Sequence, residues 1–176
     1  MYKGYPVGYF LFWANANVEH TKSIGTSAKQ KYPNLLIVDG QQRLTSLYAV
    51  IKAQEIIREN YTKATIIIAF NPLEEKFVIP DASIRKNPRF FQNISQIWQP
   101  NINIIRVINE FVQHLKKSVE LTYQEEEHIQ NVFILLKNLE SYPFSALELS
   151  TNITEEQVAD VFVRINSQGK TDLARV

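Results

Sequence analysis

Hydrophobic residues change their spacing several times along this chain, and each change marks an expected element. Short runs of β-branched, aliphatic and aromatic residues predict strands, because these residue types favour extended backbone. Apolar residues repeated at intervals of three and four predict helices. The expected strands are 7–13, 35–39, 65–70, 76–79 and 144–149, and the expected helices are 41–60, 102–119, 124–139 and a last one beginning near Thr154.

Polar stretches between these runs indicate where the chain turns. Residues 14–34 are rich in Ser, Thr and Asn and predict a loop. The stretch 83–99 is irregular, with short helical turns expected around 90–98. Thr154 and Gln157 have the spacing of a capping box, and Gly169 is the expected end of the last helix. The order of elements predicts a mixed α/β or α+β domain.

Composition narrows the class of protein. The 176 residues, 45% hydrophobic and 21% charged, fit one soluble globular domain, expected here to be a fragment of a longer, cytoplasmic protein. There is no Cys, which excludes disulfides and thiol nucleophiles, and the three His lack ligand spacing, so no Cys- or His-based metal site such as a zinc site is expected. The net charge of +1 gives no sign of a nucleic-acid partner, and no apolar run reaches the roughly 18–20 residues of a membrane span.

The most informative segment is the aliphatic run 35–39 and the polar residues that follow it. Asp39 and Gly40 form an expected turn, and Gln41 opens the next helix. A helix start leaves backbone N–H groups unpaired, which suits an anion such as phosphate. Arg43 adds a guanidinium able to grip two phosphate oxygens. The alternative is an ordinary Asp-Gly turn with no ligand.

Three blocks of this sequence resemble the GmrSD-type restriction-system family. Residues 39–45, Asp-Gly-Gln-Gln-Arg-Leu-Thr, look like its DGQQR signature. Residues 162–170 are similar to its downstream F-x-R-I-N-x-x-G block, and residues 5–10 resemble its first strand. The family also carries a Gln-Arg pair upstream that this sequence does not include, so the active site of the fragment is expected to be incomplete, and the fragment inactive alone.

The resemblance implies an α+β fold related to ParB and sulfiredoxin: a small mixed sheet with helices and a helical insertion at about 84–140. It implies phage defence, in which a nucleoside triphosphate, with or without Mg²⁺, is hydrolysed and drives cleavage of foreign or modified DNA. The nuclease region would lie elsewhere in the protein or in a partner chain. The chain would thus be an NTPase, or part of a restriction endonuclease.

Within that resemblance the motif residues take chemical roles. Gly40 would allow close approach of the backbone, Gln41 or Gln42 would bind phosphate or orient water, and Arg43 would neutralise phosphate charge, with Asp39 as base or metal partner. The expected catalytic residues are Asp39, Gln41, Gln42 and Arg43, and the expected nucleotide-binding residues are Gly40, Thr45, Arg164, Asn166, Gly169 and Lys170. For Thr45 the alternative is a solvated or back-bonded hydroxyl.

The downstream block presents a geometric difficulty. Arg164 and Asn166 lie about 200° apart on an ideal helix and cannot share one face. We therefore expect the helix to end between them, so that 166–169 forms a loop beside 39–43 and Lys170 reaches a phosphate. The alternative is a helix with an exposed Arg and a Gly C-cap.

A local excess of basic residues suggests a second class of function. Residues 81–119 contain six Lys or Arg against two acidic residues, with Phe and Trp interleaved. Such a stretch fits contact with a nucleic-acid backbone, although a solvated surface is the alternative. The chain would then be a DNA-binding or assembly module without turnover, and the expected DNA-binding residues are Arg85, Lys86 and Arg89.

Overall fold

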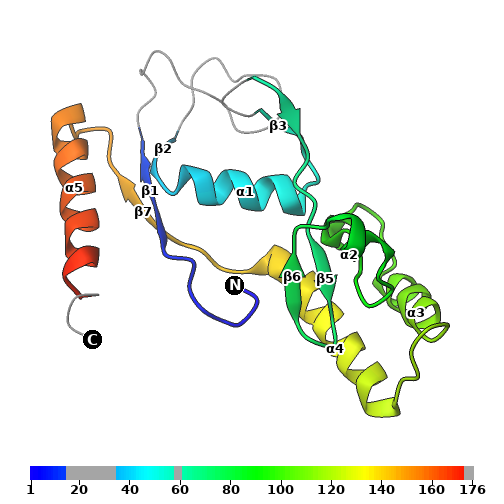
Figure 1. Cartoon of the computed structure of the whole chain (residues 1–176). Helices are drawn as coiled ribbons and strands as arrows, with labels where there is room; N and C mark the ends of the chain where they lie inside the picture. The colour runs from blue at the N-terminus through cyan, green and yellow to red at the C-terminus, as the bar shows by residue number, and fades with distance from the viewer. Residues whose placement is uncertain (15–34, 58–60, 173–176) are drawn as a thin grey trace. The chain divides into compact units, whose positions relative to one another are not determined.

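The computed structural model describes residues 1–14, 35–57 and 61–172, the last five of these by backbone alone. The predicted loop at 14–34 therefore lies outside the described residues from position 15 onward. The chain divides into two compact units (Figure 1). The smaller unit comprises 6–45 and 143–176, and the larger unit comprises 1–5 and 46–142. No helix in the described part of the chain is long and apolar enough to cross a membrane.

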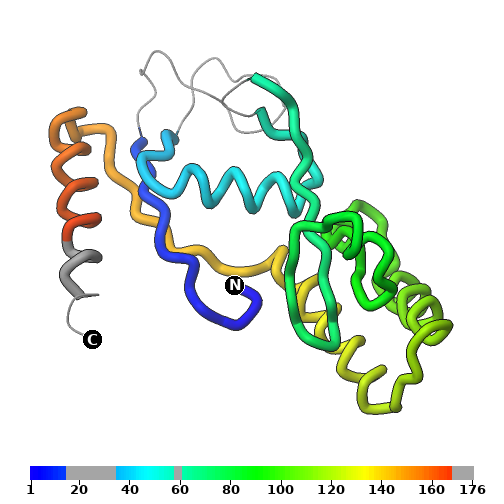
Figure 2. Tube along the Cα trace, viewed as in Figure 1, coloured from blue at the N-terminus to red at the C-terminus, as the bar shows by residue number. Residues whose placement is uncertain are grey.

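The smaller unit contains a mixed sheet in the order β2-β1-β7. Its strands are β1 (Tyr9–Trp13), β2 (Leu36–Asp39) and β7 (Ser145–Leu149). β1 runs antiparallel to β2 and parallel to β7, so the blue and orange segments of Figure 2 lie side by side. The predicted small mixed sheet is confirmed, and so is the α+β class. The likeness to ParB and sulfiredoxin stays a prediction.

Helix α5 (Glu155–Asp172) covers this sheet with its apolar side. Val158 is buried together with Leu11, Trp13 and Leu149. The predicted capping box is present, since Thr154 N donates to Gln157 Oε1 at 3.0 Å and Gln157 N to Thr154 Oγ1 at 3.4 Å. The prediction that Gly169 ends this helix was wrong, because α5 continues to Asp172.

Helix α1 (Gln41–Ile51) is shorter than the predicted 41–60. It ends where Ala53 adopts a φ of +52°, with Gln54 N donating to Ala49 O at 3.0 Å, an arrangement common at helix C-termini. The chain then forms β3 (Ile56–Ile57), which pairs with β4 (Lys63–Ala64). The two consecutive β-branched residues of β3 favour this extended backbone over another helical turn.

The larger unit contains a hairpin of β5 (Ala69–Asn71) and β6 (Lys76–Val78). The predicted turn after Asn71 is confirmed, and the Oδ1 atom of Asn71 accepts a hydrogen bond from Leu73 N at 3.1 Å. The predicted strand at 65–70 was too long, because 65–68 has no ladder partner among the described residues. The chain continues into α2 (Ala82–Lys86), which we did not predict, and the 3-10 helix η1 (Ile94–Trp98).

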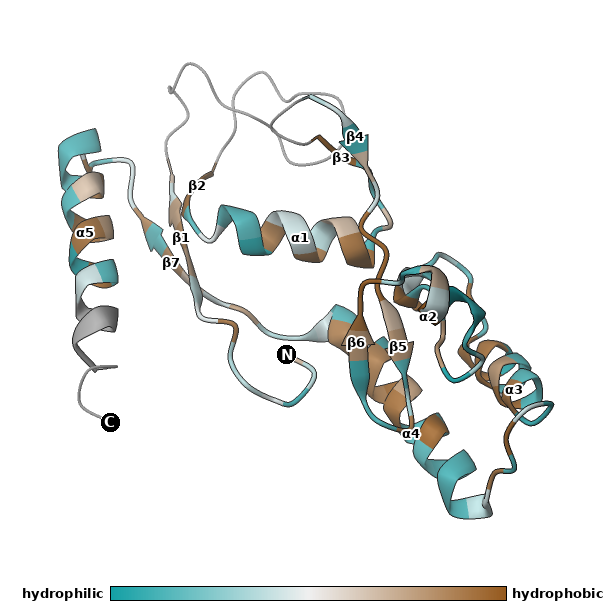
Figure 3. Ribbon diagram, in the orientation of Figure 1, coloured by the Kyte–Doolittle hydropathy of each residue, from teal (hydrophilic) through white to brown (hydrophobic). Residues whose placement is uncertain are grey.

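Two antiparallel helices supply most of the core of the larger unit. They are α3 (Ile104–Leu115) and α4 (Tyr123–Asn138), close to the predicted 102–119 and 124–139, and α4 leads into the 3-10 helix η2 (Leu139–Ser141). Their hydrophobic stripes appear brown in Figure 3. Phe133 is fully buried and contacts the rings of Phe70, Phe91 and Phe111.

The first residues of the chain pack in this larger unit. The ring of Tyr2 lies edge-on to Phe70 at 5.8 Å and to Phe77 at 5.2 Å between centroids. Burial, together with the nearby Glu75 carboxylate, raises the pKa of the Tyr2 phenol above its ordinary value. The Tyr142 hydroxyl donates to Tyr5 O at 3.2 Å, so the chain segments that enter and leave the unit are joined.

Candidate functional site

The DGQQR residues form a strand, a tight turn and a helix start, as the sequence predicts. β2 ends at Asp39, Gly40 turns the chain with a φ of +88°, and α1 begins at Gln41. A Cβ at Gly40 would lie 2.5 Å from Cδ1 of Phe10. Glycine is therefore required at position 40 for two reasons: the positive φ disfavours other residues, and a Cβ would clash with the Phe10 ring.

The first turn of α1 is open to a ligand. Leu44 N makes the first helical hydrogen bond, to Gly40 O at 2.9 Å. Nothing among the described residues accepts a hydrogen bond from the backbone amides of Gln41, Gln42 and Arg43. The side chains of Gln41 and Gln42 are exposed. Three unpaired N–H groups at a helix start, flanked by two amide side chains, can bind an anion.

Arg43 is directed at the protein itself. Its Nη1 donates to Val7 O at 2.6 Å, and its Nη2 donates to Tyr9 O at 3.1 Å and to Asp39 Oδ2 at 3.3 Å. The guanidinium carbon also lies 5.4 Å from the centre of the Phe10 ring, within range of a cation–π interaction. Both terminal nitrogens thus bind the chain, and the expected grip on two phosphate oxygens stays a prediction.

Gly8 completes this arrangement, and the sequence reasoning did not single it out. Its φ of +82° is unfavourable for any other residue, and a Cβ there would collide with Nη1 of Arg43. Gly8 also explains why β1 begins at Tyr9 and not at the predicted Val7. The available signal was a glycine inside an otherwise apolar run, which often marks a close approach of another group.

Asp39 is the acidic group of the motif, and its side chain is partly buried. One of its oxygens faces Arg43, so the carboxylate helps to hold the guanidinium in place. Among the described residues, no group of three or more His, Asp or Glu side chains is arranged to hold a metal ion. The role of Asp39 as base or metal partner remains a prediction.

Comparison with known proteins decides the family. The family model described as "GmrSD restriction endonuclease, N-terminal domain" matches residues 1–173. The chain belongs to the GmrSD N-terminal domain family. It is also 31% identical over 150 residues to the uncharacterized protein MJ0686 of Methanocaldococcus jannaschii. That alignment covers 78% of this chain and 26% of the archaeal protein, so the chain spans about a quarter of that relative.

The downstream block of this GmrSD domain does not form the expected loop. α5 continues through 166–169, since one glycine costs a helix only about 1 kcal/mol. The side chain of Asn166 stays on this helix, where its Nδ2 donates to Phe162 O at 3.0 Å. Arg164 and Asn166 are exposed, and no described hydrogen bond or ion pair joins them to 39–43. Gly169 and Lys170 lie within the helix, and only their backbone is described. Thr45 is half-buried on α1.

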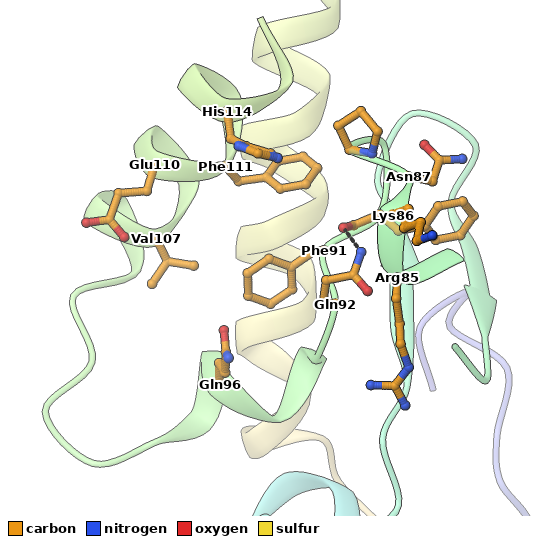
Figure 4. A pocket seen from close by; sticks show the side chains of 12 residues that line it. Arg85, Lys86, Asn87, Phe91, Gln92, Gln96, Val107, Glu110, Phe111 and His114 are labelled. Carbon is orange, nitrogen blue, oxygen red and sulfur yellow. Dashed lines mark hydrogen bonds between the residues drawn. The ribbon is translucent and has the colours of Figure 1, made fainter. Parts of the chain in front are cut away.

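The larger unit of the GmrSD domain contains a cavity of about 400 Å³, and an arginine and a lysine of this unit line it. Arg85 and Lys86, at the end of α2, line it and are exposed. Arg89 is exposed but does not line it. Hydrogen bonds from Thr122 lower the pKa of the Glu125 carboxyl, and the charge of Arg89 adds a smaller effect in the same direction. The structure therefore brings two of the three predicted DNA-binding residues to one cavity (Figure 4).

Proposed function

We propose that this GmrSD N-terminal domain binds a nucleoside triphosphate, with or without Mg²⁺, at the start of α1. Its hydrolysis would be coupled to cleavage of foreign or modified DNA by a nuclease region elsewhere in the protein or in a partner chain. The observation that carries the proposal is the first turn of α1, where three unpaired backbone amides and two exposed glutamines directly follow Gly40. Membership of the family supports the link to a restriction system.

The contacts of Arg43 suggest which motif residues would contact the phosphates and which would hold the turn in place. Gln41, Gln42 and the backbone amides would contact the phosphates directly. Arg43 would act as a positioning residue, since its bonds to Val7 O and Tyr9 O fix the turn that presents those amides. Asp39 keeps one carboxylate oxygen, Oδ1, that faces no described partner and would orient water or a metal ion.

Removing both exposed amide side chains should weaken nucleotide binding. We expect Gln41→Ala combined with Gln42→Ala to lower affinity for a nucleoside triphosphate at least tenfold, because hydrogen bonds to a charged group contribute roughly 1.5–3 kcal/mol each. Calorimetric titration of the intact protein with ATP and with GTP, with and without Mg²⁺, would measure it. Gln130→Ala, an exposed glutamine on α4, is the matched control. If the double variant binds nucleotide as tightly as the unaltered protein, the proposed site is wrong.

A second candidate function is DNA binding without turnover. The observation that favours it is the cavity beside Arg85 and Lys86, where exposed cations stand next to aromatic side chains. Cations of this kind contact phosphates and aromatic rings contact bases. This function is compatible with nucleotide hydrolysis in the same protein.

DNA binding through this surface would depend on salt in a defined way. Changing Arg85, Lys86 and Arg89 together to Glu should reduce the slope of log affinity against log salt by about 2, since each phosphate contact contributes roughly 0.7–0.9. Fluorescence anisotropy with a labelled single strand would give the slope. Lys3→Glu, Lys52→Glu and Lys76→Glu make the same charge change elsewhere in the larger unit and serve as control. An unaltered slope in the first variant would contradict DNA contact here.

A further inference from the structure

The cavity of the larger unit has two walls of different origin. One wall comes from α2 and the segment leading to η1, and includes Phe91 and Gln92; the other comes from α3 and includes Val107 and Phe111 (Figure 4). Its volume of about 400 Å³ is at the small end of the range for ligand pockets, roughly 300–1,000 Å³. It therefore suits one small ligand, or one unit of a polymer.

Aromatic rings form a rigid apolar corner in this cavity. The rings of Phe91 and Phe111 are 6.0 Å apart between centroids and nearly perpendicular, at 83°. Phe91 is further held against the buried Phe133, at 5.2 Å and 81°. Because the core fixes both rings, a flat ligand could stack on one of them at little cost in side-chain order.

The exposed amide of Gln96 supplies hydrogen-bonding capacity beside these rings, whereas the amide of Gln92 is held by the chain itself. Gln92 Nε2 donates to Ile84 O at 3.1 Å and to Phe90 O at 2.9 Å. Since both partners are carbonyl oxygens, this amide nitrogen is fixed, and the Gln92 side chain shapes the wall without presenting a group to a ligand, because its Oε1 is buried. Gln96, on η1, lines the same cavity with an exposed side chain. Amides both donate and accept, as the edges of nucleobases do.

The charge of the cavity favours an anionic neighbour. Arg85 and Lys86 are exposed on its α2 side. The acidic residue of the lining, Glu110, is paired with Arg106 Nε at 2.7 Å, so its negative charge is compensated. A ligand that carries a phosphate next to a flat ring would find cations on one side and no free carboxylate in the lining.

We propose that this cavity binds one nucleotide of single-stranded DNA, with the base against Phe91 and Phe111 and the neighbouring phosphate on Arg85 and Lys86. The inference rests on the second candidate function and adds a base subsite to it. The site is separate in the sequence from the start of α1, where the nucleoside triphosphate is proposed to bind. Base stacking on aromatic side chains accepts any base, so the subsite would recognise an unpaired nucleotide more than a sequence.

The test compares a labelled twelve-nucleotide single strand with a strand of the same length that lacks all its bases. We expect the full chain to bind the complete strand at least about fivefold more tightly, since stacking of one base is worth about 5- to 150-fold. Val107→Trp, which fills the cavity from α3, should bring the two affinities within about twofold. Ile105→Trp, on an exposed position of the same helix outside the lining, should keep the difference.

Each outcome of this experiment has a clear meaning. If both strands bind equally and with the same salt dependence, the base subsite is wrong while DNA contact through the cations survives. If neither strand binds, the second candidate function fails together with the subsite. If a free nucleoside monophosphate competes at the affinity of the whole strand, and Val107→Trp abolishes that binding, the ligand is a free nucleotide and the DNA assignment is wrong. Thermal unfolding of both Trp variants would verify that they fold.

Discussion

Replacing Arg43 with alanine should destabilise the smaller unit by about 2–3 kcal/mol, because two backbone carbonyls and a carboxylate lose a charged donor at once. The affected atoms are Val7 O, Tyr9 O and Asp39 Oδ2, and the Phe10 ring loses its cation. Hydrogen exchange would localise the effect. Amides of β1 should lose protection, while amides of α4, in the larger unit, should keep it.

A lysine at position 43 distinguishes the effect of the positive charge from the effect of the planar guanidinium geometry. Arg43→Lys keeps a cation but cannot reach two carbonyls and a carboxylate with a planar fork, so we expect it to recover less than half of the lost stability. If β1 amides in either variant are protected as well as in the unaltered protein, the hydrogen bonds of Arg43 to Val7 O and Tyr9 O do not stabilise this unit. A loss of nucleotide binding in these variants would not by itself make Arg43 a phosphate ligand, because the same loss follows if the turn is disordered. The Gln41 and Gln42 double variant is the sharper test of where the nucleotide binds.

Truncating Phe133 to alanine should have the largest effect on stability, about 3–5 kcal/mol. This ring is fully buried on α4, and its centroid lies 5.2 Å from that of Phe91 and 5.5 Å from that of Phe111. Its removal leaves a cavity between the rings of Phe70, Phe91 and Phe111, which cannot all shift to fill it. Urea denaturation should show a lower midpoint at an unchanged slope.

The neighbouring residue on the same helix provides the matched control. Ile134 is about half exposed, at 48%, so Ile134→Ala should cost less than about 1 kcal/mol. If the two substitutions have similar effects, Phe133 is not the centre of this core. The Phe133 variant should also weaken the preference for the base-containing strand, because Phe91 would lose the ring that holds it.

Elements with strong local signals were predicted well from the sequence. The motif turn needed only an aliphatic run, Asp-Gly and the start of a periodic helix, all within a dozen residues. The helices α3 and α4 followed from apolar residues repeated over several turns. The ends of α1 and α5 were less predictable. Ala53 gives no local sign of a positive φ, and the single Gly169 is too weak a breaker to end a helix that already has a packed face.

The parts of the candidate site that depend on distant residues could not be predicted. The partners of Arg43 are carbonyls of Val7 and Tyr9, more than thirty positions earlier in the chain, and backbone acceptors carry no sequence signature. The cavity is likewise built by side chains from α2, η1 and α3, whose meeting depends on the packing of the whole core. The sequence indicated the cations of that surface and the Phe and Trp residues interleaved with them in 81–119, but not which of these rings line the cavity.

The parallel pairing of β1 with β7 has a consequence for synthesis on the ribosome. β1 is made early, yet its second neighbour emerges only after the entire segment 46–142 has been translated. Until then, the side chains of Leu11 and Trp13 lack Leu149, the β7 residue with which they are buried in the folded unit. Folding of this sheet is expected to be slow, because β1 and β7 are distant in the sequence and must come together before they can pair. A nascent chain halted before Ser145 would therefore expose the apolar residues of an incomplete sheet, although the larger unit already has all its residues, and would be a natural client for a chaperone.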